Sequence, residues 1–272
     1  MSELFSKIFG KKKKTLGLSL GGGGAKGGVH LGALRAFEEE GIEFDVVSGT
    51  SIGSIIGGMY ARGLSWREIE AVISSAGLND LKNLIFTRLA GGGIDEIIAL
   101  ATGTLEFSDL KKPFACVAVD LFSGEERVFK EGNLIKAMGA SSAIAPYFRA
   151  VTIDGRQYVD GAYRNIIPCD AAVGLGADYV VGIDLSMRRE TTARGKRFLD
   201  DMYPNNNVPI VNPTEAGYKA CDFMLAPDLA EFSSTSFNAV GEMFDIGYFT
   251  TKENIPAIKR DLYSKGIRKF KL

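Results

Sequence analysis

Short apolar runs alternate with stretches of helical periodicity along most of the chain. The runs at 15–20, 44–48, 114–120 and 179–185 are mostly apolar, which is typical of strands buried on both faces of a sheet. Between them, apolar side chains recur every three or four residues, as in amphipathic helices. Strands that alternate with helices predict an α/β fold, a three-layer α/β/α sandwich with a mainly parallel central sheet.

Local signals set the bounds of further elements. Ser65 with Glu68 three residues later forms a capping box, which predicts the start of a helix over 66–76. The pair Asp154-Gly155 separates two short strand patterns and predicts a two-residue hairpin turn. The other predicted elements are a strand at 126–129, helices at 133–141, 237–248 and 255–264, and an apolar stretch at 81–89, where a buried helix is preferred over a lipid-facing flap.

The first 14 residues have a pattern of their own. Leu4, Phe5, Ile8 and Phe9 fall on one side of a helix, and four lysines follow at 11–14. This combination suits contact of residues 4–14 with an anionic membrane surface, although a solvated tail is the preferred interpretation. We therefore predict an amphipathic, basic segment over 1–14 and one folded domain over 15–272.

Two glycine-rich turns each lie between a predicted strand and a predicted helix. In the second turn, Ser51 stands between Gly49 and Gly53, a spacing typical of a nucleophile elbow. The N–H of Ile52 would then lie at a helix N-terminus, where it can stabilise negative charge. The first turn, Gly22-Gly23-Gly24-Ala25-Lys26-Gly27, can direct successive N–H groups toward one point and so bind an oxyanion.

The first turn also fits a dinucleotide-binding pattern through Gly22, Gly24 and Gly27. That pattern requires an acidic residue at the end of the second strand, where this chain has serine, glycine and threonine. A phosphate-binding P-loop is excluded, because glycine and not serine or threonine follows Lys26.

A serine nucleophile needs a base, and the chain has one histidine, His30. His30 falls within a predicted helix, where a packed, neutral ring is the preferred interpretation. Two aspartates are better candidates. Asp154 belongs to the predicted hairpin turn, whereas Asp160 ends the second hairpin strand and faces a loop, where catalytic groups gather. The residues alone leave Asp160 evenly balanced between a base and a second turn.

The two glycine turns and Asp160-Gly161-Ala162 follow the order and approximate spacing of the patatin-like phospholipases, and the chain from residue 15 to about 248 looks like a bacterial member of that family. The resemblance implies a catalytic dyad of Ser51 and Asp160. It implies an oxyanion hole at Gly22, Gly23, Gly24 and Ile52, with Lys26, Gly27, Gly49, Gly53 and Gly161 as supporting motif positions. The implied activity is hydrolysis of lipid carboxylic esters, of phospholipase A or lysophospholipase type, through an acyl-enzyme.

Composition narrows the remaining choices. The 272 residues are 46% hydrophobic with a net charge of −1, so one large core is expected and nucleic acid is not an expected partner. Three separated cysteines indicate free thiols, and with a single histidine they predict no metal and no cofactor. No apolar run reaches about 18 residues and no signal-peptide core is present. We predict a cytoplasmic protein, with peripheral membrane contact as the less favoured interpretation of its N-terminal segment. The alternative function is a non-catalytic lipid- or partner-binding protein on the same fold.

Overall fold

A computed structural model describes residues 13–75, 94–103, 105–186 and 193–270. The apolar stretch at 81–89 and most of the N-terminal segment lie outside the described residues. No helix in the described part of the chain is long and apolar enough to cross a membrane.

The described residues form an eight-stranded, mainly parallel sheet in the order β5-β6-β3-β2-β1-β7-β8, with β4 paired to the other edge of β3. The predicted fold class is confirmed. The parallel strands are β1 (Leu16–Leu20), β2 (Val46–Gly49), β3 (Phe114–Asp120), β7 (Tyr179–Ile183) and β8 (Phe223–Leu225). The antiparallel strands are β4 (Glu126–Phe129), β5 (Val151–Ile153) and β6 (Arg156–Asp160).

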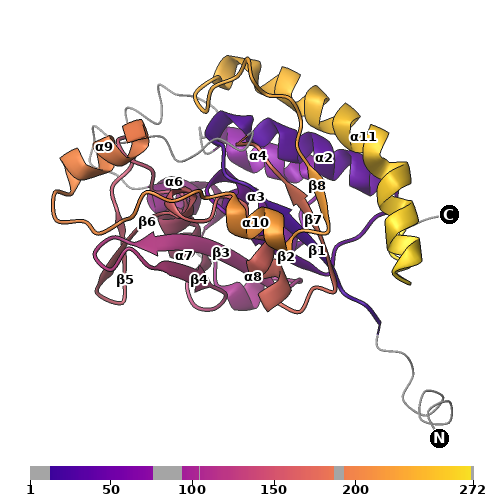
Figure 1. The fold of residues 1–272 in the computed structure, drawn as a ribbon, viewed down its shortest axis with the longest axis horizontal. Coiled ribbons are helices and arrows are strands. Elements are labelled where there is room, and N and C mark those ends of the chain that lie inside the picture. Colours follow the sequence, from indigo (N-terminus) through magenta and orange to yellow (C-terminus); the bar gives the residue numbers. More distant parts are fainter. Residues whose placement is uncertain (1–12, 76–93, 104, 187–192, 271–272) are drawn as a thin grey trace, which may run out of the picture.

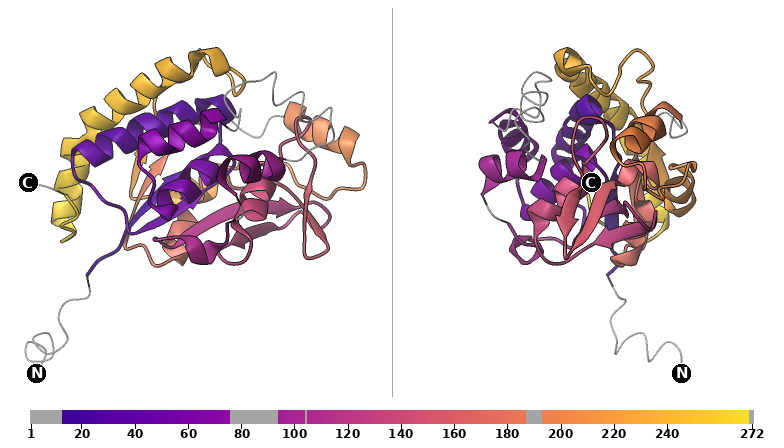
Figure 2. Two further views of the ribbon diagram at one scale, coloured as in Figure 1. Left: turned by 180° about the vertical axis from the view of Figure 1, so that it is seen from behind. Right: turned by 90° about the vertical axis from the view of Figure 1, so that its left-hand side faces the viewer.

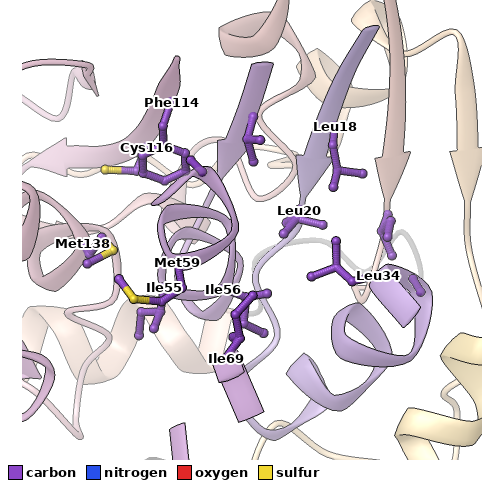
Figure 3. Packing of buried hydrophobic residues seen from close by; sticks show 14 of the residues in the cluster. Leu18, Leu20, Leu34, Ile55, Ile56, Met59, Ile69, Phe114, Cys116 and Met138 are labelled. Carbon is purple, nitrogen blue, oxygen red and sulfur yellow. The ribbon is translucent and has the colours of Figure 1, made fainter. Parts of the chain in front are cut away.

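Helices cover both faces of the sheet, so that the fold has three layers (Figure 1). The main core lies on one face, where Leu16, Leu18 and Leu20 of β1 are fully buried (Figure 3). This face is covered by α2 (Gly28–Glu39), α3 (Ile52–Arg62), α4 (Trp66–Ser75), α6 (Ile94–Thr102), α7 (Leu134–Ser141) and α11 (Val240–Ser264). Two short helices, α8 (Cys169–Gly174) and α10 (Glu215–Ala220), lie on the opposite face.

Several local predictions are confirmed by the structure. The capping box forms at the start of α4, where the Ser65 N–H donates to the Glu68 carboxylate at 2.8 Å. The hairpin of β5 and β6 turns at Asp154 and Gly155, whose φ values of 49° and 75° suit a two-residue turn. Asp154 is exposed there, as its place in a turn predicts.

The prediction of two closing helices is wrong. Residues 240–264 form one helix, α11, with Pro256 inside it. Proline removes one backbone hydrogen bond and normally ends or bends a helix. Here α11 packs along the outer side of α2 (Figure 2), and burial of Ile255 and Ile258 on either side of the proline offsets that loss. The 186–220 region also contains a helix that the sequence did not predict, α9 (Ala193–Met202).

The close approach of α2 and α11 depends on two glycines. A Cβ added to Gly32 would lie 2.0 Å from the Phe244 carbonyl oxygen, and one added to Gly247 would lie 2.2 Å from the Val29 carbonyl oxygen. Neither contact can be relieved by turning a side chain, because both involve backbone atoms. The two helices must separate if either glycine gains a side chain.

We therefore expect Gly247→Ala to lower the free energy of unfolding by about 1–3 kcal/mol, the usual cost of overpacking. Gly241 is the matched control, since it lies in the same helix, is exposed and has nothing within 4 Å of an added Cβ. Gly241→Ala should leave stability unchanged or raise it by up to about 1 kcal/mol, from helix propensity alone. Urea unfolding of the two variants measures the difference, and equal stabilities would contradict the packing argument.

Candidate active site

Ser51 lies in a strained turn between β2 and α3. Its φ of 55° and ψ of −129° belong to a region that residues with a side chain rarely adopt. The flanking glycines are required by packing: a Cβ on Gly49 would lie 2.3 Å from the Gly53 oxygen, and one on Gly53 would lie 2.1 Å from the Leu20 oxygen. The Ser51 N–H donates to both the carbonyl and the hydroxyl oxygen of Ser141, each at 3.1 Å, which holds the turn in place.

Strand β3 brings Ser51 and Asp160 together. Gly49 at the end of β2 pairs with Cys116, and Asp160 at the end of β6 pairs with Ala118. Strand β4 occupies the other edge of β3 at both positions, so β2 and β6 share one edge. Because β2 runs parallel to β3 and β6 antiparallel, their carboxyl ends meet. The Ser51 Oγ donates to the Asp160 Oδ2 at 2.8 Å.

The Asp160 side chain is almost fully buried, with 1% of the residue exposed. Its Oδ1 accepts the Ala162 N–H at 2.8 Å, and its own N–H donates to the Ala143 carbonyl at 3.2 Å. Burial raises the pKa of Asp160 to about 7, although the hydrogen bonds from Ala162 and Ser51 oppose this shift. The carboxyl group can therefore gain and lose a proton near neutral pH.

The loop that follows Asp160 is fastened to the end of β2. The Thr50 hydroxyl donates to the Asn165 carbonyl at 2.8 Å, and the Ser48 hydroxyl donates to the Pro168 carbonyl at 2.7 Å. Gly161 starts this loop because a Cβ there would lie 2.3 Å from the Val117 oxygen. Ser48 and Thr50 were not identified as site residues from the sequence. Their position next to the nucleophile elbow was the one feature of the sequence that could have indicated a role in the site.

In the glycine turn after β1, some backbone N–H groups already donate a hydrogen bond within the protein and others do not. The Gly22 N–H donates to the Ile166 carbonyl at 2.9 Å, so it is already engaged. Within the described part of the chain, the N–H groups of Gly23, Gly24 and Ile52 have no hydrogen-bond acceptor. Gly24 has a φ of 58°. All three residues line the same cavity as Ser51.

The supporting positions of this turn are buried. The Lys26 Nζ donates to the Leu185 carbonyl at 3.4 Å. Gly27 allows contact with the elbow, since a Cβ there would lie 2.5 Å from the Ile52 side chain. These contacts hold the glycine turn against α3 and against the segment that follows β7.

His30 takes no part in the cavity. Its ring is fully buried in α2, and its Nε2 lies 2.7 Å from the Gly21 carbonyl, to which it donates as a neutral imidazole. Burial lowers the pKa of His30 to about 4. The structure places the ring behind the glycine turn as a packed, neutral side chain, as the sequence favoured.

The cavity has a volume of about 250 Å³. Ser51 and Asp160 lie at one part of its wall, and most of the remaining wall is apolar. The apolar side chains come from α3, α6, the segment after α7 and the start of the C-terminal region: Ile52, Ile55, Ile94, Ile144, Phe148 and Phe237. A polar reacting centre in an apolar cavity suits a substrate with one polar bond and a hydrocarbon part.

Among the described residues, no group of three or more histidine, cysteine or acidic side chains could hold a metal ion. The three cysteines form no disulfide bond, and the side chains of Cys116 and Cys169 are buried.

Comparison with known proteins agrees with the geometry. Patatin-like phospholipase domain-containing protein 6 of Homo sapiens is 31% identical over an alignment of 218 positions, which covers 70% of this chain and 16% of that protein. Neuropathy target esterase sws of Drosophila melanogaster is 26% identical over an alignment of 276 positions, which covers 86% of this chain and 19% of that protein. The chain thus spans less than a fifth of the length of these relatives. Both are animal proteins, so a bacterial origin stays a prediction.

A solved structure and a family model complete the comparison. The superposition on VipD from Legionella pneumophila covers 90% of this chain and 67% of the VipD chain, with a TM-score of 0.56 and 14% sequence identity. At this identity the similarity shows the fold alone. The family model for patatin-like phospholipase matches residues 18–173, more than half of the chain. On this evidence the chain belongs to the patatin-like phospholipase family.

Proposed function

We propose that this protein is a serine acyl hydrolase of phospholipase A or lysophospholipase type, which cleaves lipid carboxylic esters through a dyad of Ser51 and Asp160. The observation that carries the proposal is the 2.8 Å hydrogen bond from Ser51 Oγ to a buried carboxylate. Family membership and the apolar cavity support a lipid ester as the substrate class.

The first half of the reaction forms an acyl-enzyme. Asp160 Oδ2 accepts the proton of Ser51 Oγ as the oxygen attacks the ester carbonyl carbon. The negative charge that develops on the carbonyl oxygen is stabilised by the N–H groups of Gly23, Gly24 and Ile52. Gly22 has no part in this hole, because its N–H already binds the Ile166 carbonyl. Asp160 then gives its proton to the leaving alcohol.

The second half returns the enzyme to its starting state. Water attacks the acyl carbon while Asp160 accepts one of its protons, and the same N–H groups hold the second oxyanion. An ordinary aspartate has a pKa of about 3.9 and is a weak base for this step. The raised pKa of Asp160, about 7, brings the carboxylate much closer to the basicity that proton transfer requires.

A non-catalytic protein on the same fold is the alternative. Such a protein would need neither the strained backbone of Ser51 nor a buried carboxylate hydrogen-bonded to the serine. Both features are unfavourable for folding. We expect a fluorophosphonate probe to label the protein at one site, Ser51, and Ser51→Ala to lose both labelling and ester hydrolysis. Mass spectrometry of the labelled peptide makes the assignment. A wild-type protein that remains unlabelled would favour the non-catalytic alternative.

The two Asp-Gly pairs provide a matched test of the base. Asp160→Asn removes the proton acceptor and should lower kcat by about a hundredfold or more. Asp154→Asn changes the same chemical group in an exposed turn and should retain wild-type activity. Assays with a soluble ester measure both. If Asp160→Asn kept more than a tenth of the wild-type kcat, Asp160 would not be the base.

The pH dependence follows from the raised pKa of Asp160. The base acts as the ionised carboxylate, so kcat/KM should rise with pH, reach half its maximum near pH 7 and level off above it. A carboxyl whose pKa is raised on folding stabilises the fold at low pH, and this contribution is lost as pH rises through about 7. Asp160→Asn should therefore unfold at a higher temperature than wild type at pH 8. A flat kcat/KM between pH 5 and 8 would contradict the assignment.

Contact of residues 4–14 with an anionic membrane is part of the proposal. Lys13 and Lys14, the last residues of this segment, lie beside three cations at the chain's C-terminal region, Lys265, Arg268 and Lys269. Asp222 and Asp45 compensate part of this charge through ion pairs with Lys265 and Lys269. Lys13 and Lys14 precede the amino end of β1 (Figure 1), and Lys269 pairs with Asp45, whose N–H donates to the Leu16 carbonyl. The cavity lies beyond the carboxyl end of β1, since Gly23 and Gly24 line it.

Deletion of residues 1–14 should reduce binding to anionic vesicles at low salt, because each lysine contributes roughly 1 kcal/mol near such a surface and salt screens it. Hydrolysis of a short soluble ester should not change, since the deletion leaves Ser51 and Asp160 in place and neither Lys13 nor Lys14 lines the cavity. Co-sedimentation with vesicles at two salt concentrations tests this. Equal binding with and without the segment would indicate a solvated tail.

A further inference from the structure

Ser142 lies on the short segment that holds both members of the dyad. Its neighbour Ser141 accepts the N–H of Ser51, and its other neighbour Ala143 accepts the N–H of Asp160. Any side chain at position 142 is therefore placed beside the reacting centre by the same backbone that positions the nucleophile and the base. Ser142 lines the catalytic cavity together with them.

The Ser142 hydroxyl has no partner of its own. The residue is 3% exposed, and its Oγ makes no hydrogen bond with any described group. The other buried side-chain atoms of the described residues that lack a partner belong to Ser19, His30 and Asn165, none of which lines the cavity. A buried hydroxyl without a partner is unfavourable, so the position is occupied by a polar ligand atom or a water during function.

In the proposed reaction, the attacking water has fewer assigned hydrogen-bond partners than the other polar groups. The oxyanion has the backbone N–H groups, and the acyl chain has the apolar wall. In the mechanism above, the attacking water has one assigned partner, Asp160, although a fixed water normally has two to four partners. We propose that Ser142 Oγ is the second partner of this water, an inference that rests on the proposed hydrolase function.

The step is balanced with no further reactant. The water donates one hydrogen bond to Asp160 Oδ2 and another to Ser142 Oγ. Together these two bonds direct a lone pair of the water oxygen at the acyl carbon. The new carbon–oxygen bond forms as Asp160 takes the first proton. The bond from the acyl carbon to Ser51 Oγ then breaks, and Asp160 returns that proton to Ser51 Oγ as the carboxylic acid leaves.

The test separates acylation from deacylation with a p-nitrophenyl ester in stopped flow. The p-nitrophenolate leaves without a proton, so its release in the first turnover reports acylation alone. Ser142→Ala should acylate at nearly the wild-type rate and deacylate about tenfold more slowly, the factor that one lost hydrogen bond corresponds to. A burst of one p-nitrophenolate per enzyme should then precede a slow steady rate.

Three further serine variants control this result. Ser142→Thr keeps the hydroxyl and should restore most of the steady rate, whereas the exposed Ser264→Ala should behave as wild type. Ser142→Cys keeps the shape with a much weaker acceptor and carries the same expectation as Ser142→Ala should the alanine variant not fold. Thermal unfolding of each variant reports its folded state.

Three outcomes would overturn the inference. One is a wild-type steady rate without a burst in folded Ser142→Ala. Another is equal slowing of acylation, deacylation and fluorophosphonate labelling, which would indicate that Ser142 only supports the structure around Ser51. The last is a wild-type protein that is neither labelled at Ser51 nor active on the ester, which removes the hydrolase function and this inference together.

Discussion

The candidate active site depends on one edge of β3, where the carboxyl ends of β2 and β6 meet. Ser51 and Asp160 are 109 positions apart, and no local interaction brings them together. Their distance is set by the strand register that pairs Gly49 with Cys116 and Asp160 with Ala118. A slip of either strand would turn its side chains to the other face of the sheet, so the register of this edge determines whether a dyad exists.

The same site carries the strain and the desolvation that the rest of the fold must offset. Ser51 holds an unfavourable backbone conformation, and Asp160 is a carboxyl group buried with a raised pKa. Both features are held by backbone groups of one segment, through the Ser141 and Ala143 carbonyls. That segment begins at Ser141, the last residue of α7, whose side chains belong to the main core, so core packing keeps the site in its strained geometry.

The sequence predicted the parts of the site that depend on neighbouring residues. Gly49 and Gly53 are recognisable because the elbow requires close approach within five residues, and Asp154 is recognisable as a turn. The choice of Asp160 required the family resemblance, since its partner comes from a distant strand. The engagement of Gly22 by Ile166 could not be predicted, because the acceptor is 144 positions away. The continuity of α11 through residues 249–254 could not be predicted for a related reason, since it depends on packing against α2, which is a tertiary effect.

In the reaction that we propose, the buried carboxylate also changes how charge moves. In a triad with histidine, the neutral base becomes a cation as the oxyanion forms, so two opposite charges are created. Here Asp160 loses its charge when it takes the proton, and the single negative charge passes to the oxyanion. An apolar cavity opposes the creation of charge more than its transfer between two well-placed sites. The one histidine, neutral and bonded to Gly21, is therefore free to support the glycine turn whose N–H groups receive that charge.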